Sequence, residues 1–268
     1  MDINNLLKLA IKAALDAGAE IMDVYGMEDF GVEYKDDKSP LTLADKRANE
    51  AIEAILILAD IHILSEEGRA ISYEERKNWE VLWVVDPLDG TKEFVKRNGE
   101  FTVNIALVKD NTPILGVIYV PVKRELYFAA EGVGAYKIGN ISKNSGYAEE
   151  VRDLIADAIL LPIPIDKHTY VVVGSRSHMS EATQDYVKSL SQSHDTVELV
   201  SAGSAIKLCL VAEGVADEYP RFAPTMEWDT AAGHAIANFA GKQVTVHETG
   251  EELKYNRENL VNPWFVVK

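Results

Sequence analysis

Cysteine is almost absent from this sequence. The only one among 268 residues is Cys209, which lies in the apolar run 207–211 and is expected in the core. A single thiol excludes an internal disulfide and a zinc site built from several cysteines. Because such sparing use of cysteine is typical of a reducing compartment, we expect a cytoplasmic location.

Basic residues are also scarce. Lysine and arginine number 27 against 43 acidic residues, which gives a formal net charge of −16. A nucleic-acid polymer or an anionic membrane surface is therefore excluded as a partner, because both require a basic face. A small anionic substrate stays open, provided that bound metals or a few well-placed cations meet it.

Long apolar runs are missing too. No stretch approaches the length of a membrane span, and residues 1–5 lack the basic region of a signal peptide, so we expect no transmembrane segment. The content of 47% hydrophobic and 26% charged residues is ordinary for a soluble enzyme with one large core or two smaller ones.

The first half has the pattern of helices packed on a sheet. Residues 3–25 repeat apolar side chains at helical spacing, and a second helix is expected to open at 41–45. Apolar segments separated by Gly, Pro, Asn and Asp then predict an antiparallel meander. Its strands are expected at 101–109, 113–120, 124–130 and 134–138.

The second half alternates strands with helices, which indicates an α/β domain. A less regular region with Pro162 and Pro164 separates the halves, so we divide the chain into domains 1–145 and 146–268. The expected elements are strands at 170–174, 196–200, 214–218, 244–246 and 265–267, and helices at 181–190, 204–213 and 229–240.

The most informative stretch is 81–94, Val-Leu-Trp-Val-Val-Asp-Pro-Leu-Asp-Gly-Thr-Lys-Glu-Phe. Its apolar start predicts a buried strand, which Pro87 is expected to end. Asp86 and Asp89 would then converge in a turn, where carboxylate oxygens can bind magnesium. Gly90 allows close backbone approach, and its amide and that of Thr91 can donate to a phosphate. The alternative is a plain polar turn capped by aspartate.

Further acids lie at element boundaries. Glu66 follows the short strand 61–64, and Asp229 lies where a helix begins, so both could join Asp86 and Asp89 in a multi-metal site. No histidine pair has zinc spacing, which favours magnesium. Glu66 could instead belong to a solvated loop. Asp45 lies three residues after Thr42, a spacing that also fits a helix capping box.

Several motifs together resemble a known family, the lithium-sensitive, magnesium-dependent phosphomonoesterases that include inositol monophosphatase. Within that family the chain is most similar to the 3'(2'),5'-bisphosphate nucleotidases of the bacterial CysQ type, an assignment that places it in sulfur metabolism. The resemblance covers nearly the whole chain and implies an α/β (α+β) fold, a five-layer αβαβα sandwich with the active site between its halves. The matching motifs lie at 64–67, 85–94, 98–107, 175–178, 207–214, 219–222 and 228–233.

The resemblance also implies a ligand set. One magnesium would be held by Glu66, Asp86 and the carbonyl of Leu88, and a second by Asp86, Asp89 and Asp229. Asp86 would bridge the two ions. Glu66 would also serve a third, weaker site.

Catalytic roles follow from the same resemblance. Thr91 and Asp45 would orient the attacking water, and Glu66 would assist. Two cations a few Å apart suit in-line displacement without a covalent intermediate. This chemistry does not distinguish between substrates.

Substrate choice is expected to come from the second half. His178, Ser204, Lys207 and Arg221 match positions that contact the nucleotide in bisphosphate nucleotidases, together with Gly90, Thr91 and Asp229 near the metals. Two cations and two hydrogen-bonding groups suit a second phosphate. Each of the four residues from the second half has a structural alternative. His178 could cap a helix, Ser204 could be an N-cap, Lys207 could lie on a solvated helix face, and Arg221 could form a structural ion pair.

The sequence thus favours a magnesium-dependent phosphatase that converts adenosine 3',5'-bisphosphate to AMP and phosphate. Within the same superfamily the alternative is an inositol monophosphatase or a sugar-phosphate phosphatase. A different class, a catalytically silent metal or nucleotide sensor, is disfavoured because the acids and Thr91 are all present. A homodimer stays open.

Overall fold

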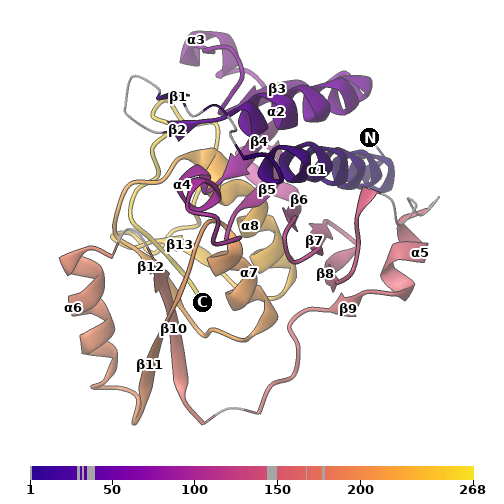
Figure 1. Ribbon diagram of the computed structural model, residues 1–268. Coiled ribbons are helices and arrows are strands. Elements are labelled where there is room, and N and C mark those ends of the chain that lie inside the picture. Colours follow the sequence, from indigo (N-terminus) through magenta and orange to yellow (C-terminus); the bar gives the residue numbers. More distant parts are fainter. Residues whose placement is uncertain are drawn as a thin grey trace.

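The chain folds into alternating layers of helices and sheets (Figure 1). The computed structural model describes residues 2–28, 31, 33–34, 40–143, 150–166, 168–176 and 179–268. Helices α1 (Ile3–Tyr25) and α2 (Leu43–Leu56) form the first layer, as their apolar spacing predicted. They pack on one face of a seven-stranded sheet.

This sheet contains the expected meander. Its order is β3-β4-β5-β6-β7-β8-β9, with β3 parallel to β4 and the other neighbours antiparallel. The strands are β3 (His62–Ser65), β4 (Val81–Asp89), β5 (Thr102–Lys109), β6 (Thr112–Val120), β7 (Glu125–Ala130), β8 (Gly134–Ile138) and β9 (Ile159–Leu160).

Both faces of the sheet are covered, which explains the continuous apolar runs. On β4, Trp83 and Val85 point into the core below α1 and α2, whereas Leu82 and Val84 point into a second core on the opposite face. That second core is formed with α7 (Ile206–Glu213) and α8 (Glu227–Phe239). The expected burial of Cys209 is confirmed.

Beyond α7 and α8 lie two small sheets. Strands β10 (Tyr170–Ser175) and β11 (Val197–Ala202) pair in parallel, and β12 (Tyr219–Arg221), β14 (Phe265–Val267) and β13 (Val244–Val246) form an antiparallel sheet. A bridge between Val172 and Glu218 joins them. Helix α6 (Glu181–Leu190) is the outermost layer, which completes the predicted αβαβα sandwich.

One element of the second half was predicted wrongly. Residues 214–217 of the expected strand form a turn, Glu218 makes an isolated bridge, and β12 begins only at Tyr219. Gly214 adopts a left-handed conformation with φ of 83° and ends α7, so the chain cannot extend directly from the helix.

The remaining elements are short. They are β1 (Glu33–Tyr34), β2 (Pro40–Leu41), η1 (Ile57–Ala59), α3 (Tyr73–Arg76), α4 (Thr91–Val95) and α5 (Val151–Ala156). Helix α5 packs beside α1, and β9 pairs with β8, so 151–160 adjoin the first sheet. The division at residue 145 stays a prediction.

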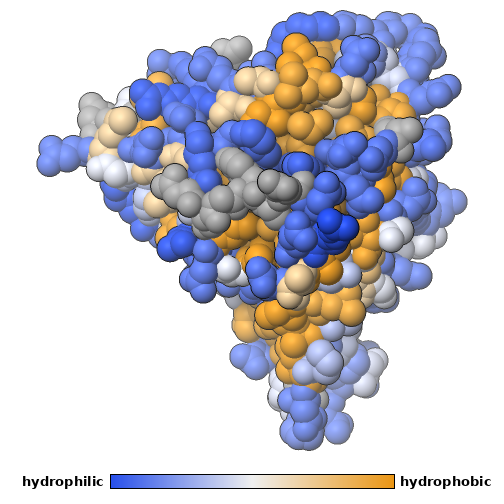
Figure 2. Space-filling view, turned by 90° about the vertical axis from the view of Figure 1, so that its right-hand side faces the viewer, coloured by the Kyte–Doolittle hydropathy of each residue, from blue (hydrophilic) through white to orange (hydrophobic). Residues whose placement is uncertain are grey.

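The face of the molecule drawn in Figure 2 has a mixed surface. On the face shown in Figure 2, hydrophilic residues cover much of the surface and apolar residues appear between them. Within the described part of the chain, no helix combines the length and the apolar character required to cross a membrane.

Candidate active site

The turn after β4 carries the first group of site residues. We expected Pro87 to end the strand, but β4 continues to Asp89 through an irregularity in its pairing with β5. Asp86 pairs with Asn104 and Asp89 with Thr102, so three steps on β4 match two on β5. This bulge brings both aspartates to the edge of one pocket, as bulges next to functional sites often do.

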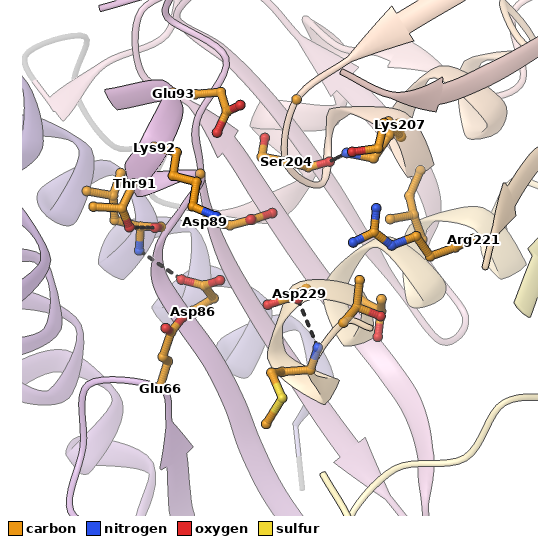
Figure 3. Close-up of a pocket in the computed structure, with 18 of the residues that line it drawn as sticks. Glu66, Asp86, Asp89, Thr91, Lys92, Glu93, Ser204, Lys207, Arg221 and Asp229 are labelled. Carbon is orange, nitrogen blue, oxygen red and sulfur yellow. Dashed lines mark hydrogen bonds between the residues drawn. The ribbon is translucent and has the colours of Figure 1, made fainter. Parts of the chain in front are cut away.

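Gly90 then reverses the chain into α4. Its φ of 95° lies in the left-handed region, and an added Cβ would come within 3.1 Å of the carbonyl oxygen of Glu100. Both constraints require glycine here. Thr91 consequently begins α4 with its side chain beside the Asp86 and Asp89 carboxylates (Figure 3).

The predicted acids meet in this pocket. Carboxylate oxygens of Glu66, Asp86 and Asp229 all lie within 4.8 Å of one another. Glu66 follows β3 and its amide donates to the carbonyl of Val85 at 3.1 Å, so it lies beside β4. Asp229 reaches the cluster from the first turn of α8, where it accepts from the Met226 amide at 2.9 Å. Asp89 lines the same pocket.

The cluster is electrostatically costly without a cation. Burial, together with the charges of Glu66, Asp89 and Asp229, raises the pKa of Asp86 well above its usual value. Burial likewise raises the pKa of Asp89 to about 6, and burial and Asp89 raise the pKa of Asp229. An all-oxygen set of buried, mutually repelling carboxylates fits a hard divalent cation such as magnesium.

Asp45 caps helix α2, as its spacing from Thr42 predicted, and it also contacts Thr91. One oxygen, Oδ2, accepts from the Thr42 amide at 2.7 Å and the Thr42 hydroxyl at 2.6 Å, which completes a capping box on α2. The other oxygen, Oδ1, accepts from the Thr91 hydroxyl at 3.2 Å. The cap therefore fixes the carboxylate that contacts Thr91.

The opposite wall comes from the second half of the chain. Lys207 on α7, Ser204 before it and Arg221 on β12 line the same pocket of about 350 Å³ (Figure 3). The Lys207 ammonium donates to the Ser204 carbonyl, and the Arg221 guanidinium donates to the Pro224 carbonyl at 2.9 Å. Burial lowers the pKa of Lys207 to about 8, although the Asp89 charge opposes this.

The structural roles that the sequence left open for Ser204, Lys207 and Arg221 are not observed. The N-cap of α7 is Ala205 rather than Ser204, and Lys207 is buried. Among the described residues Arg221 forms no ion pair, and its Nε atom is buried without a hydrogen-bond partner. The Ser204 hydroxyl is also buried and unpartnered there. His178 lies outside the described residues.

Some pocket residues were missed by the sequence interpretation. Tyr219 lines the pocket, with the Lys207 ammonium 5.6 Å from the centre of its ring. Because Tyr219 and Arg221 lie two apart on β12, strand periodicity places them on the same face and could have identified Tyr219. Lys92, Glu93 and Ser175 also line the pocket and lie within motifs already recognised.

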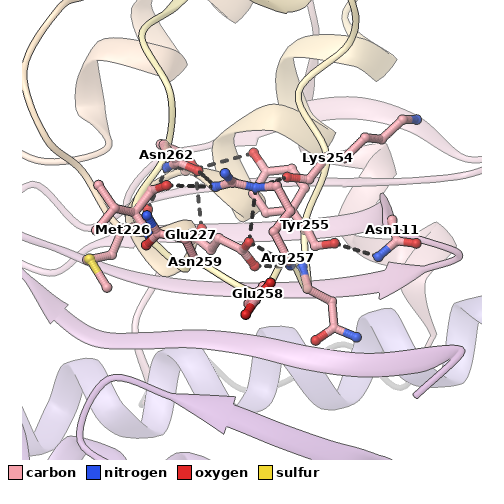
Figure 4. A network of polar contacts seen from close by, with 12 residues as sticks. Asn111, Met226, Glu227, Lys254, Tyr255, Arg257, Glu258, Asn259 and Asn262 are labelled. Atoms are coloured by element: carbon pink, nitrogen blue, oxygen red, sulfur yellow. Dashed lines mark hydrogen bonds and ion pairs between the residues drawn. The ribbon is translucent and has the colours of Figure 1, made fainter. Parts of the chain in front are cut away.

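A buried polar network supports the start of α8 (Figure 4). The Glu227 carboxylate accepts from the amides of Asn256 at 2.6 Å and Arg257 at 3.0 Å. The Asn262 amide group donates to the Met226 carbonyl at 2.8 Å. The C-terminal segment therefore fixes the turn that presents Asp229.

Comparison with known proteins identifies the family of the chain that forms this pocket. The model of the inositol monophosphatase family matches residues 2–264. The chain belongs to the inositol monophosphatase family. Enzymes of this family are metal-dependent, and the acidic cluster is consistent with that property.

Relatives within the family include named bisphosphate nucleotidases. The chain is 45% identical to the 3'(2'),5'-bisphosphate nucleotidase CysQ of Salmonella typhimurium, over 98% of this chain and 99% of that protein. It is 44% identical to the protein of the same name from Escherichia coli K12, with equal coverage. The predicted resemblance to the CysQ branch is confirmed.

Solved structures share the fold of this chain. CysQ from Bacteroides thetaiotaomicron superposes with a TM-score of 0.92 at 52% identity, over 99% of this chain and 97% of that one. The suhB protein of Bartonella henselae, at 24% identity and a TM-score of 0.72, shares the fold over 98% of this chain and 93% of that one.

Proposed function

We propose that this family member is a magnesium-dependent phosphomonoesterase that hydrolyses the 3'-phosphate of adenosine 3',5'-bisphosphate to AMP and phosphate. The observation that carries the proposal is the composition of one pocket. Four carboxylates on one side meet Lys207, Arg221 and the Ser204 hydroxyl on the other. The names of the relatives at 44–45% identity support the same substrate class.

The carboxylates would hold the metals. Glu66, Asp86 and the Leu88 carbonyl would hold one magnesium, and Asp86, Asp89 and Asp229 a second, with a third weaker site at Glu66. Bound magnesium ions would lower the pKa of a water and neutralise charge on the phosphoryl group.

The chain itself would orient the attacking water. The Thr91 hydroxyl lies within donating distance of Asp45 Oδ1, at 3.2 Å, and of the Leu88 carbonyl, at 3.3 Å, so its oxygen can accept a hydrogen bond from the attacking water. Asp45 cannot swing away, because its Oδ2 is held by the Thr42 amide and hydroxyl. The amides of Gly90 and Thr91 would bind the phosphate being removed.

The second phosphate would bind to the opposite wall. The Arg221 guanidinium uses Nη2 for the Pro224 carbonyl, and its buried Nε has no partner among the described residues. The unpartnered Ser204 hydroxyl and the Lys207 ammonium lie on the same wall. Arginine and lysine beside a hydroxyl offer a phosphate dianion several hydrogen-bond donors and two positive charges. His178 would complete the site.

The test is phosphate release from a panel of substrates with magnesium varied. We expect adenosine 3',5'-bisphosphate to be hydrolysed with a kcat/KM at least about 100-fold above that of inositol monophosphate, which has no second phosphate for the opposite wall, and above that of fructose 1,6-bisphosphate, whose two phosphates are held on a different framework. Comparable rates on inositol monophosphate would favour the alternative within the family. Release that does not depend on magnesium would contradict the metal assignment.

A further inference from the structure

Glu100 connects the two halves of the molecule beside the pocket. It lies two residues before β5, and its carboxylate contacts residues that directly follow β10 and β11. Arg176 donates from Nε to Glu100 Oε2 and from Nη2 to Oε1, both at 2.8 Å. The Gly203 amide adds a third bond to Oε2 at 2.8 Å. Arg176 also donates to the Ser201 carbonyl at 2.9 Å.

This geometry differs from that of an ordinary surface ion pair. The Arg176 side chain is 48% exposed and that of Glu100 is 22% exposed, so the attraction between the charges is partly screened. The two parallel bonds, however, fix the plane of both groups. The pair therefore contributes more to orientation than to stability.

The loop held in this way carries Ser204. Glu100 accepts the amide of Gly203, so a carboxylate of the first half of the chain holds the residue that directly precedes Ser204. Ser204 itself has a φ of 42°, in the left-handed region that is unfavourable for a serine. Its carbonyl accepts from the Lys207 ammonium. These contacts leave its buried hydroxyl as the group without a partner among the described residues.

The loop packs closely against the backbone of Glu100. A Cβ added to Gly203 would lie 2.7 Å from the carbonyl oxygen of Glu100 and 2.9 Å from the Cβ of Glu100. The same carbonyl oxygen lies 3.1 Å from the position of a Cβ on Gly90. The backbone of Glu100 thus lies between the turn at Gly90 and the loop at Ser204.

We propose that Glu100 and Arg176 are a positioning pair that sets the Ser204 hydroxyl against the second phosphate of the substrate. The inference rests on the proposed function and deepens it. Preference for a doubly phosphorylated nucleotide then depends on two side chains that do not touch the substrate. Glu100 positions the loop from the first half, and Arg176 fixes the orientation of Glu100.

Kinetics on two matched substrates test the pair. For Glu100→Gln and for Arg176→Gln we expect KM for adenosine 3',5'-bisphosphate to rise about tenfold, the effect of one misplaced contact to a charged group. We expect kcat, and KM for adenosine 3'-monophosphate, to stay within about twofold. The double variant should resemble either single one, because the two residues act as one unit. Glu75→Gln, which breaks the exposed pair of Glu75 with Arg69, is the control and should change nothing.

A second measurement needs no substrate. In Glu100→Gln, amide hydrogen exchange in the segment 201–206 should be faster than in the wild type, while that in α1 should be unchanged. Unchanged exchange in 201–206, or equal KM increases on both nucleotides, would overturn the positioning role. Faster exchange in a protein whose wild type fails to hydrolyse the bisphosphate would instead overturn the proposed function.

Discussion

At the scale of single residues, Asp45 shows why one side chain can satisfy two interpretations. Its spacing from Thr42 predicted a capping box, and the resemblance implied a catalytic role. The two carboxylate oxygens have different partners, since Oδ2 accepts from Thr42 and Oδ1 from Thr91, so the cap leaves one oxygen for the proposed catalytic role. A local pattern that explains a residue therefore does not exclude a functional role for it.

A substitution at Asp89 should affect catalysis without destabilising the fold. Replacement by asparagine preserves the shape and removes one charge from a cluster whose members raise one another's pKa. We expect Asp89→Asn to lose at least about 100-fold in kcat while its melting temperature without magnesium stays equal or rises. Phosphate release and thermal unfolding in EDTA check this. Asp110→Asn, at an exposed turn, is the matched control. Normal turnover of Asp89→Asn at saturating magnesium would contradict the ligand role.

Lys207 predicts a dependence of substrate binding on pH. Burial lowers the pKa of its ammonium to about 8, so the group is charged below that pH and becomes neutral above it. Affinity for the second phosphate should be fully present below pH 8 and decline as the pH rises through it. We expect KM for the bisphosphate to rise between about pH 8 and pH 9.5, by up to about tenfold per pH unit. Lys207→Arg stays charged and should flatten this rise; an equally steep rise in that variant would refute the assignment.

At the scale of elements, close packing of α8 on the sheet sets the depth of Asp229. A Cβ on Gly116 of β6 would lie 2.2 Å from the Ala232 carbonyl oxygen and 2.9 Å from the Ala235 Cβ. Helix backbone thus rests directly on strand backbone. On the other side, a Cβ on Gly233 would lie 2.7 Å from the Cβ of Leu208 on α7. Gly116 on β6 and Gly233 on α8 thus allow α8 to pack closely between the sheet and α7.

We expect Gly116→Ala to destabilise the protein by about 2–3 kcal/mol, because backbone must move to admit the methyl group. Magnesium affinity should weaken as well, since the shift carries Asp229 away from Asp86. Urea unfolding and the magnesium dependence of phosphate release measure the two effects. Gly139→Ala is the control, because an added Cβ there meets nothing within 4 Å. Stability equal to the wild type would show that the sheet accommodates the methyl group.

The elements also show what can be predicted from a sequence. Helix α1 and the meander followed from periodicity, because each buries a regular set of side chains in a large core. The bulge at Asp86 and Asp89 did not follow, since it depends on how β5 pairs with β4. The site residues could be identified by motif, but the Glu100–Arg176 bonds could not. They join residues 76 positions apart, whose contact exists only in the folded chain.

At the scale of the whole molecule, the net charge of −16 destabilises the folded state through repulsion between like charges. The acidic residues include the carboxylate cluster of Glu66, Asp86 and Asp229, whose oxygens lie within 4.8 Å of one another. Divalent cations would therefore stabilise the protein in two distinct ways, by site binding and by general screening. The two can be separated.

Site binding should dominate. A ligand that binds only the folded state adds RT ln(1 + [L]/Kd), about 2.7 kcal/mol at 100 times Kd. We expect magnesium to raise the melting temperature of the wild type in proportion to this term and to have a much smaller effect on Asp89→Asn. Sodium chloride at matched ionic strength screens the same net charge without filling the site, so it should shift both proteins equally. If it reproduced the magnesium effect on the wild type, the stabilisation would come from screening, and the cluster would not be a resident metal site.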